Sequence, residues 1–365
     1  MAFDPVEEDS LRLILEALRR DGKDPVRDVD FIRSCAEAYR TDASRLVRTD
    51  RDRSFHLTAQ AAELLDYQVP FMQDEARIQE LEARAEGLLA EAASLDETNW
   101  DARRMLVALQ APSNDAYVEY LLEHAPRVEA ALAATVEAAR DEYDREFCDD
   151  LARRPYLRWL AATAAQAGIA GRYRLALEAA ETCLALSPAD AVGARHSGML
   201  ALGKLEADPA EIFAWRRRHE AAYRFLPAWM QGRKISVGCD AEHPDDAWSI
   251  LVLMSGAYRS CNYEVATDWL RQLLSAYRDG AAALHFQAEF PEALFCRPRV
   301  EPGSLDELVL AVSECTPLLQ EGLGTPDNAG FAVWVATHEL VRGALPAELA
   351  QTPMPPIAGG VEGGA

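Results

Sequence analysis

Hydrophobic and small residues recur every three or four positions along most of the chain, a spacing that places them on one face of an α-helix. The clearest example is the segment 154–190. Its first half carries such residues at Leu157, Leu160, Ala161, Ala164 and Ala165. The alternation typical of strands is sparse, with one short candidate at residues 235–239. The pattern predicts an all-α protein.

The same segment is predicted to form two helices joined by a tight turn. Pro155 suits the first turn of a helix, because the N–H that proline lacks has no intrahelical partner there. The first helix is expected to end between Gly168 and Gly171, because glycine readily adopts the left-handed conformation of a C-terminal cap. The second helix is expected to begin near Tyr173 and to end before Pro188.

Other segments with the same periodicity predict further helices. They are residues 85–109, residues 116–147 with a break at Pro126, and residues 193–225, 246–277, 304–319 and 328–340. Residues 1–55 predict an N-terminal segment of two or three helices with a charged connector at 40–53. A helical repeat domain is expected to follow over 56–345. The Pro- and Gly-rich tail, 346–365, is expected to be disordered, because it buries too little surface to offset its ordering entropy.

The predicted hairpin resembles a tetratricopeptide repeat, whose unit is about 34 residues long. The positions that match the repeat are Ala164, Gly171, Tyr173, Ala176, Cys183, Leu184 and Pro188. Leu160 and Ala180 depart from it, because the repeat has tryptophan and another aromatic residue there. The resemblance implies tetratricopeptide-like helical hairpins stacked as an α-solenoid, an architecture that offers a groove to a protein partner.

The order of features is also similar to a group of bacterial tetratricopeptide proteins with no established activity. An RPYMR-type motif opens the central repeat of that group, and residues 154–158 read RPYLR here. The group's repeat closes with a proline–aspartate turn, then a glycine and an arginine, matched here by Pro188, Asp190, Gly193 and Arg195. A proline-bearing segment near the C-terminus corresponds to residues 290–295, FPEALF. The likeness covers about residues 55–345. It implies a helical scaffold and does not imply a catalytic activity.

Charge and composition exclude several classes of partner. The chain has 37 basic and 60 acidic residues and a net charge of −23, so a nucleic-acid backbone would be repelled. No apolar stretch reaches the roughly 20 residues that span a bilayer. The N-terminal MAFDPVEEDS does not resemble a secretory signal, so a cytoplasmic location is expected. Seven scattered cysteines predict reduced and mostly buried thiols.

Motifs that carry chemistry are missing from the sequence. Cys239 and His243 are four positions apart, but a zinc site needs two further ligands at compatible spacing. His338–Glu339 is not part of an H-E-x-x-H helix, and neither a G-x-S-x-G elbow nor a phosphate-binding loop occurs. The acidic run at 141–150 is typical of a solvated helix face. We therefore expect no enzyme activity, no catalytic residue, no metal and no cofactor.

A basic cluster stands at Arg216, Arg217, Arg218 and His219. Glu211 and Glu220 flank it, so an exposed helix face with local ion pairs is the favoured interpretation. Binding of an acidic peptide to this cluster is the alternative that stays open.

The RPYLR motif holds the candidate partner-binding residues. Arg154 and Arg158 are four positions apart and share a helix face with one another. In tetratricopeptide arrays the first helices line the groove, where arginines bind a partner's carboxylates. Tyr156 and Arg195 are the other two candidates. Internal ion pairs are the favoured alternative for the arginines, with partners drawn from Asp149, Asp150 and Asp190.

The resulting prediction is an interaction scaffold that binds a protein or peptide through a helical-repeat groove. Two alternatives remain open at this point. One is an enzyme of unrecognised type built on a helical toroid, and the other is a closed regulatory helical domain. The sequence carries no signal for the oligomeric state.

Overall fold

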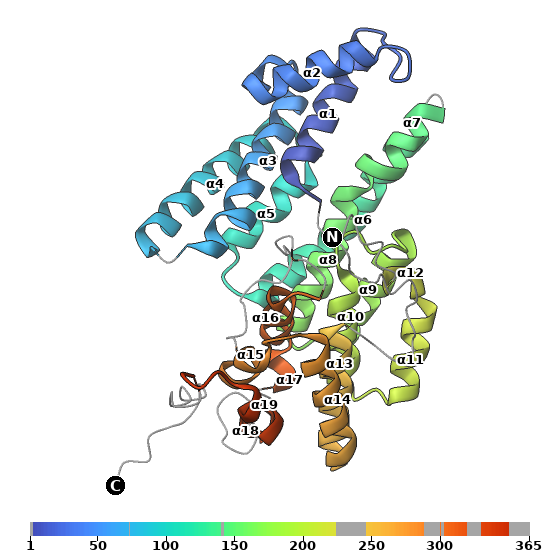
Figure 1. Cartoon of the computed structure of the whole chain (residues 1–365). Helices are drawn as coiled ribbons and strands as arrows, with labels where there is room; N and C mark the ends of the chain where they lie inside the picture. The colour runs from blue at the N-terminus through green and yellow to red at the C-terminus, as the bar shows by residue number, and fades with distance from the viewer. Residues whose placement is uncertain are drawn as a thin grey trace. The chain divides into compact units, whose positions relative to one another are not determined.

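The computed structural model describes residues 3–72, 74–139, 142–223, 246–287, 300, 303–319 and 330–349. Every regular element in these residues is a helix (Figure 1). The all-α prediction is therefore confirmed for this part of the chain. The chain divides into two compact units, residues 1–163 and residues 164–365, with 296–298 grouped with the first. The division falls inside helix α8 (Arg154–Ile169).

The first unit is a set of packed helices. Its elements are α1 (Pro5–Arg20), α2 (Val29–Asp42), η1 (Ala43–Arg45), α3 (Asp50–Tyr67), η2 (Val69–Phe71), α4 (Glu75–Leu95), α5 (Trp100–Gln110), α6 (Asn114–Glu137), α7 (Glu142–Phe147), the π-helical turn η3 (Cys148–Ala152) and the start of α8 (Arg154–Ile169). Helices α3 and α4 lie side by side, and α1 packs against α2 and α3 (Figure 1). The expected N-terminal helices are confirmed as α1 and α2.

Side-chain caps fix where these helices begin. Asp4, Asp74, Asn99 and Ser113 each accept a hydrogen bond from the first turn of the helix that follows. Thr49 forms a capping box with Asp52 at the start of α3. The predicted boundary at residue 55 lies inside α3, and the division of the chain into an N-terminal segment and a repeat domain stays a prediction.

Small side chains allow α3 and α4 to approach closely. Their shared core contains Leu57, Ala61, Leu64, Leu81, Ala85, Leu89 and Ala92, all buried. Alanine at three of these positions lets leucines of the facing helix pack against the backbone, which favours a tightly packed pair.

The predicted helix break at Pro126 is wrong. Helix α6 runs without interruption from Asn114 to Glu137, with Pro126 inside it. Proline costs a helix interior about 3 kcal/mol, because it removes one hydrogen bond and crowds the preceding turn. The buried face that Tyr117, Leu121 and Val128 present offsets this cost.

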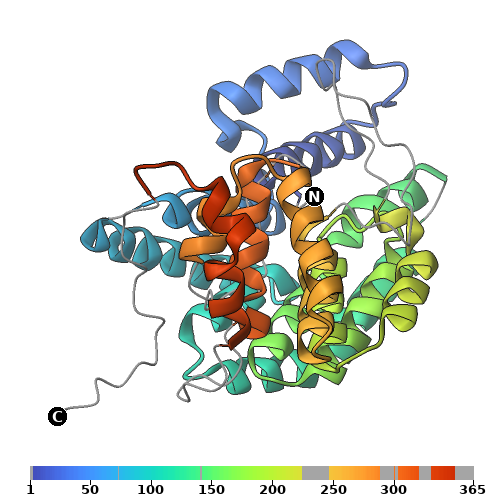
Figure 2. The same ribbon diagram turned by 60° about the horizontal axis from the view of Figure 1, so that its bottom comes forward.

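The second unit contains the end of α8 and the remaining helices. They are α9 (Tyr173–Leu186), α10 (Ala194–Lys204), α11 (Pro209–Arg218), α12 (Glu220–Tyr223), α13 (Ala247–Arg259), α14 (Tyr263–Ala276), α15 (Ala281–Phe286), α16 (Leu305–Glu314), α17 (Thr316–Leu319), α18 (Gly330–Thr337) and α19 (Glu339–Ala344). Helix α10 packs against α9 and α13, and α13 packs against α14. Figure 2 shows the red C-terminal helices beside the orange pair α13–α14.

One turn geometry recurs at the ends of helices in the second unit. Gly171, Glu206 and Cys261 follow α8, α10 and α13 with φ angles of 74°, 60° and 56°. The next residue donates its N–H back five positions in each case, with N···O distances of 2.7, 3.1 and 2.9 Å. This is the Schellman cap, and it confirms the turn predicted near Gly171. The cap at Glu206 follows the cap at Gly171 after about 35 residues, the length of a tetratricopeptide unit.

Some sequence predictions fall outside the described residues. These are the short strand at 235–239, the pair Cys239 and His243, the segment Phe290–Phe295 and residues 350–365 of the tail. The five described cysteines are free thiols. Cys35, Cys148, Cys183 and Cys315 are buried and Cys261 is exposed, as predicted for reduced and mostly buried residues.

Candidate functional site

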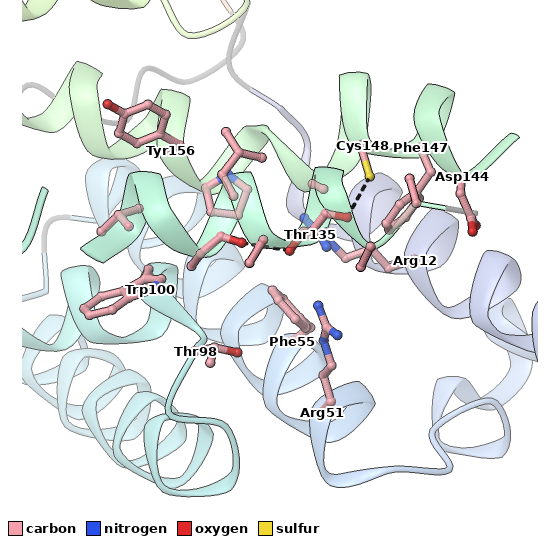
Figure 3. A pocket seen from close by; sticks show the side chains of 18 of the residues that line it. Arg12, Arg51, Phe55, Thr98, Trp100, Thr135, Asp144, Phe147, Cys148 and Tyr156 are labelled. Atoms are coloured by element: carbon pink, nitrogen blue, oxygen red, sulfur yellow. Dashed lines mark hydrogen bonds between the residues drawn. The ribbon is translucent and has the colours of Figure 1, made fainter. Parts of the chain in front are cut away.

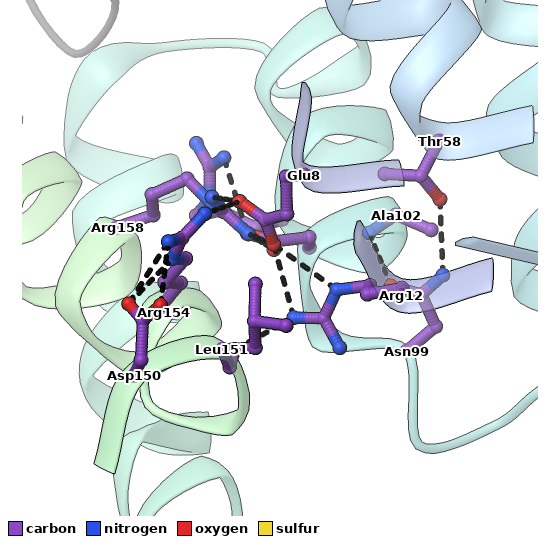
Figure 4. A network of polar contacts seen from close by, with 11 residues as sticks. Glu8, Arg12, Thr58, Asn99, Ala102, Asp150, Leu151, Arg154 and Arg158 are labelled. Carbon is purple, nitrogen blue, oxygen red and sulfur yellow. Dashed lines mark hydrogen bonds and ion pairs between the residues drawn. The ribbon is translucent and has the colours of Figure 1, made fainter. Parts of the chain in front are cut away.

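The start of α8 is held in place by a buried tryptophan. Trp159 is fully buried, and its indole N–H donates to the backbone oxygen of Leu121 in α6 at 3.0 Å. This anchor fixes the rotation of α8. As a result, Arg154 and Arg158 are directed toward a polar network (Figure 4), and Tyr156 lines a cavity (Figure 3).

Glu8 of α1 is the centre of the polar network (Figure 4). Its side chain is only 8% exposed. Its carboxylate accepts hydrogen bonds from Nε of Arg12 at 3.1 Å and from Nη1 of Arg158 at 2.7 Å. Nη1 of Arg154 lies 3.6 Å from the same carboxylate. Three guanidinium groups thus converge on one buried acid.

Each arginine of the RPYLR motif also has a second acid. Nε of Arg158 lies 3.1 and 3.0 Å from the two carboxylate oxygens of Asp101, which is buried in α5. Nη2 of Arg154 lies 2.9 Å from both oxygens of Asp150. The internal ion pair expected between Arg154 and Asp150 is therefore confirmed.

Electrostatics keep this network charged. Burial alone would raise the pKa of Glu8, but Arg158, Arg12 and Arg154 together hold that pKa well below its usual range. Asp101 is under the same opposition, and Arg158 and Arg104 lower its pKa against burial. The two acids raise the pKa of Arg158 well above its ordinary value. These donors and acceptors are engaged with one another, so the network joins α1, α5 and α8.

Arg195 belongs to the second unit, where it lies in the first turn of α10. The side chain is buried, and Nη1 donates to Oδ2 of Asp190 at 2.8 Å. Asp190 also accepts the backbone N–H groups of Ala194 at 2.7 Å and of Arg195 at 3.1 Å. The predicted Arg195–Asp190 ion pair is confirmed, and it caps the start of α10.

The basic cluster at residues 216–219 is not one exposed face. Arg216 is fully buried, with Nη1 2.5 Å from Oδ2 of Asp246 and 2.5 Å from Oγ of Ser249. Arg218 is exposed and pairs with Glu181 at 2.9 Å. The prediction of an exposed side chain is wrong for Arg216. Arg216 lies on the buried face of α11, together with Trp215 and Ile212.

A cavity of about 460 Å³ lies within the first unit (Figure 3). Side chains of α1, α3, α5, α6, α7, η3 and α8 line it, together with Thr98 ahead of α5. Pro155 and Tyr156 of the RPYLR motif belong to its wall, as do Phe55, Trp100 and Phe147. The motif therefore contributes its arginines to the network and its Pro–Tyr pair to the cavity.

Three arginines give the cavity its positive character. Arg12 and Arg19 stack over the rings of Phe55 and Phe147, each 4.5 Å from the ring centre. Arg12 pairs with Glu8, and Arg19 pairs with Asp144 at 2.5 Å.

Arg51 is engaged more weakly than the other two arginines. Its side chain is 63% exposed, and the closest carboxylate oxygen, Oδ2 of Asp96, is 4.0 Å from Nε. The guanidinium makes no hydrogen bond to another described residue. The planar group can therefore donate to an incoming carboxylate in a bidentate arrangement.

The opposite wall of the cavity is apolar. Helix α6 contributes Val128, Ala131, Leu132 and Ala134 together with Thr135, and Ala138 follows the last residue of the helix. Basic groups at one side and an aliphatic and aromatic surface at the other suit a ligand that carries an anionic group next to an apolar one. No sequence pattern predicts this site, because Arg51 and Phe55 are about 100 positions before Tyr156 and follow no recognisable motif.

Within the described residues, no group of three or more His, Cys, Asp and Glu side chains is arranged to hold a metal ion. His338 accepts the backbone N–H of Leu340 at 3.2 Å and so caps α19. The described helices include none that is long and apolar enough to cross a bilayer.

Comparisons of the chain with family models, with curated proteins and with solved structures find no match. Membership of the tetratricopeptide family thus stays a prediction from residues 154–195.

Proposed function

We propose that the chain is a tetratricopeptide-like helical scaffold that holds an acidic segment of a protein partner. The observation that carries the scaffold proposal is the recurrence of one Schellman cap at Gly171 and Glu206 after about 35 residues. Two successive helical pairs, α8–α9 and α10–α11, are closed by these turns. A unit of this length that repeats its turn is typical of helical-repeat proteins, whose common role is protein binding.

The cavity beside Tyr156 supports an acidic partner segment. The protein has a net charge of −23, so most of its surface repels acidic peptides. The cavity is an exception, because Arg12, Arg19 and Arg51 line it and Asp144 is the single acid among the described residues of its wall. A volume of about 460 Å³ accommodates one or two side chains. We place an Asp or Glu of the partner against Arg51 and a neighbouring apolar side chain against α6.

A displayed library of random peptides, selected on the full chain, tests this proposal. The expected result is enrichment of peptides in which an acidic residue stands next to an aromatic or large aliphatic residue. Arg51→Glu should abolish the enrichment, because it places a carboxylate where the peptide's acid would bind. The matched control is Arg45→Glu, because the Arg45 side chain is also 63% exposed and does not line the cavity. Equal enrichment on both variants would reject the cavity as the binding site.

Variants of the RPYLR arginines are unsuitable for this test. Arg158→Glu would bring a third carboxylate to Glu8 and Asp101, and Arg195→Glu would oppose Asp190. Both changes leave buried like charges together, so a loss of binding would report a loss of folding.

A further inference from the structure

A second cavity, of about 310 Å³, lies within the first unit between α1, α2, α3 and α4. It shares no lining residue with the cavity of Figure 3. Its wall combines acidic, basic and aliphatic side chains, all in described residues.

A hydrogen-bonded group of side chains forms one end of this cavity. Oδ2 of Asp9 accepts the hydroxyl of Tyr39 at 2.8 Å and lies 2.6 Å from Nδ1 of His56. Nε2 of His56 lies 2.9 Å from the amide nitrogen of Gln60. Asp9 therefore holds the proton of a neutral His56 on Nδ1, and Nε2 accepts from Gln60. The imidazole is fixed in orientation.

Asp9 keeps one oxygen without a hydrogen bond. Its side chain is only 1% exposed, and Oδ1 is buried with no hydrogen-bond partner. Buried polar atoms are nearly always hydrogen-bonded, and an unsatisfied one destabilises the folded protein. A donor group in the cavity would remove this cost after a small movement of the side chain.

Opposite charges on the facing helices α3 and α4 are not paired with one another. Glu63 of α3 and Arg84 of α4 both line the cavity, and neither makes a hydrogen bond or an ion pair with a described residue. The side chain of Gln68 also lines the cavity and makes no hydrogen bond with a described residue. Arg77, the other basic lining residue, pairs with Glu80. An acid and a base that share a small cavity without pairing together suit a ligand with both charges.

The remaining wall is aliphatic. Leu64, Leu81 and Leu88 line the cavity, and the first two are also part of the buried α3–α4 core. These side chains offer an apolar surface between the charged groups. A cavity of about 310 Å³ is at the lower end of the range for small-molecule sites.

We infer that this cavity binds a free α-amino acid with an aliphatic side chain. The ligand's ammonium group donates to Glu63 and to Oδ1 of Asp9. Its carboxylate accepts from Arg84. The aliphatic side chain packs against Leu64, Leu81 and Leu88, which excludes amino acids with charged side chains.

Titration calorimetry of the full chain with L-leucine tests the inference. We expect saturable binding at millimolar or lower concentration. N-acetyl-leucine lacks the ammonium charge and leucinamide lacks the carboxylate, so each should bind at least about tenfold more weakly. Glu63→Gln and Arg84→Gln should each reduce the affinity for leucine by a similar factor. Glu37→Gln is the matched control, because Glu37 is exposed in α2 and does not line the cavity.

Two results would overturn the inference. One is the failure of leucine to bind at about 10 mM, a concentration well above the millimolar dissociation constant expected for this cavity. The other is equal binding of leucine and its two blocked analogues, which would show an apolar pocket without recognition of the charges. Circular dichroism of each variant checks whether the substitutions leave the fold intact.

Discussion

Nη1 of Arg158 lies 2.7 Å from Oε2 of Glu8, and this contact joins α8 to α1 across 150 positions of sequence. The same guanidinium binds Asp101 of α5, 57 positions away. The arginine of the RPYLR motif therefore ties three helices of the first unit together. A residue that looks suited to a partner's carboxylate is already occupied by carboxylates of its own chain.

Glu8→Gln should destabilise the protein by about 3 kcal/mol. The change removes the negative charge on which Arg12, Arg154 and Arg158 converge, and leaves these buried cations with fewer partners. Urea unfolding followed by circular dichroism measures the difference. Asp30→Asn is the control, because the exposed Asp30–Arg33 pair should contribute less than about 0.5 kcal/mol. Equal effects of the two variants would show that the network does not hold the unit together.

The stability of the first unit should depend on pH through His56. Its hydrogen bond to Asp9 raises the pKa of His56 against the effect of burial, and the charges of Asp9 and Asp42 raise it further. A raised pKa in the folded state means that the contribution is full below the unfolded pKa of about 6.5 and is lost as pH rises through the folded value.

His56→Gln should remove this dependence. Urea unfolding at about pH 6 should show wild type more stable than the variant, and the difference should shrink by about pH 9. Tyr39 also contacts Asp9, but burial beside Asp9 raises the pKa of Tyr39, so its hydroxyl stays protonated over this range. A difference that stays constant with pH would contradict the role given to His56.

Gly171→Ala should destabilise the α8–α9 turn by about 1 kcal/mol. Gly171 has a φ of 74°, and a β-carbon is unfavourable in this left-handed region even though no other atom lies within 4 Å of it. Gly87→Ala should change the free energy of unfolding in the opposite direction, because Gly87 is an exposed residue in the interior of helix α4 with open space around it. That change should stabilise by about 0.5–1 kcal/mol. Thermal unfolding of both variants checks the pair, and stabilisation by both would contradict the turn geometry.

Gly198→Ala should destabilise the second unit by about 1–3 kcal/mol. A β-carbon at this position of α10 would lie 2.8 Å from Cζ2 of Trp215 and 3.1 Å from Cβ of Ala180. The buried indole cannot move without disturbing its neighbours. Gly256→Ala in α13 meets no atom within 4 Å and serves as the control in the same urea titration. An unchanged midpoint for Gly198→Ala would show that the indole has room to shift.

Local patterns in the sequence are sufficient to predict two helical hairpins and two ion pairs. Periodicity predicted the hairpins at 154–190 and 246–277, and Asp150 and Asp190 are four and five positions from the arginines that they bind. Interactions at this spacing follow from the geometry of a helix or a turn. Their confirmation therefore depends on no knowledge of tertiary packing.

Long-range contacts could not be predicted in this way. Glu8 and Asp101 are 150 and 57 positions from Arg158, and no spacing rule connects them. The same reason explains why Arg51 was missed and why Arg216 was wrongly placed on the surface. The helix break predicted at Pro126 is wrong for a different reason. The tendency of proline to end a helix is outweighed by the packing of the buried face of α6. One sequence without tertiary information specifies elements better than it specifies sites.

A charge-swap titration tests whether the cavity beside Tyr156 binds an acidic partner segment. A library-selected peptide and its Asp-to-Lys or Glu-to-Lys counterpart are titrated into wild type, Arg51→Glu and Arg45→Glu. The readout is the tryptophan fluorescence of the chain, to which Trp100 in the cavity wall contributes. The account predicts that Arg51→Glu weakens the acidic peptide about tenfold or more, a change of at least about 1.4 kcal/mol, and that the lysine peptide regains affinity for this variant alone. Equal affinity of the acidic peptide for all three proteins would contradict the proposal that this cavity holds an acidic partner segment.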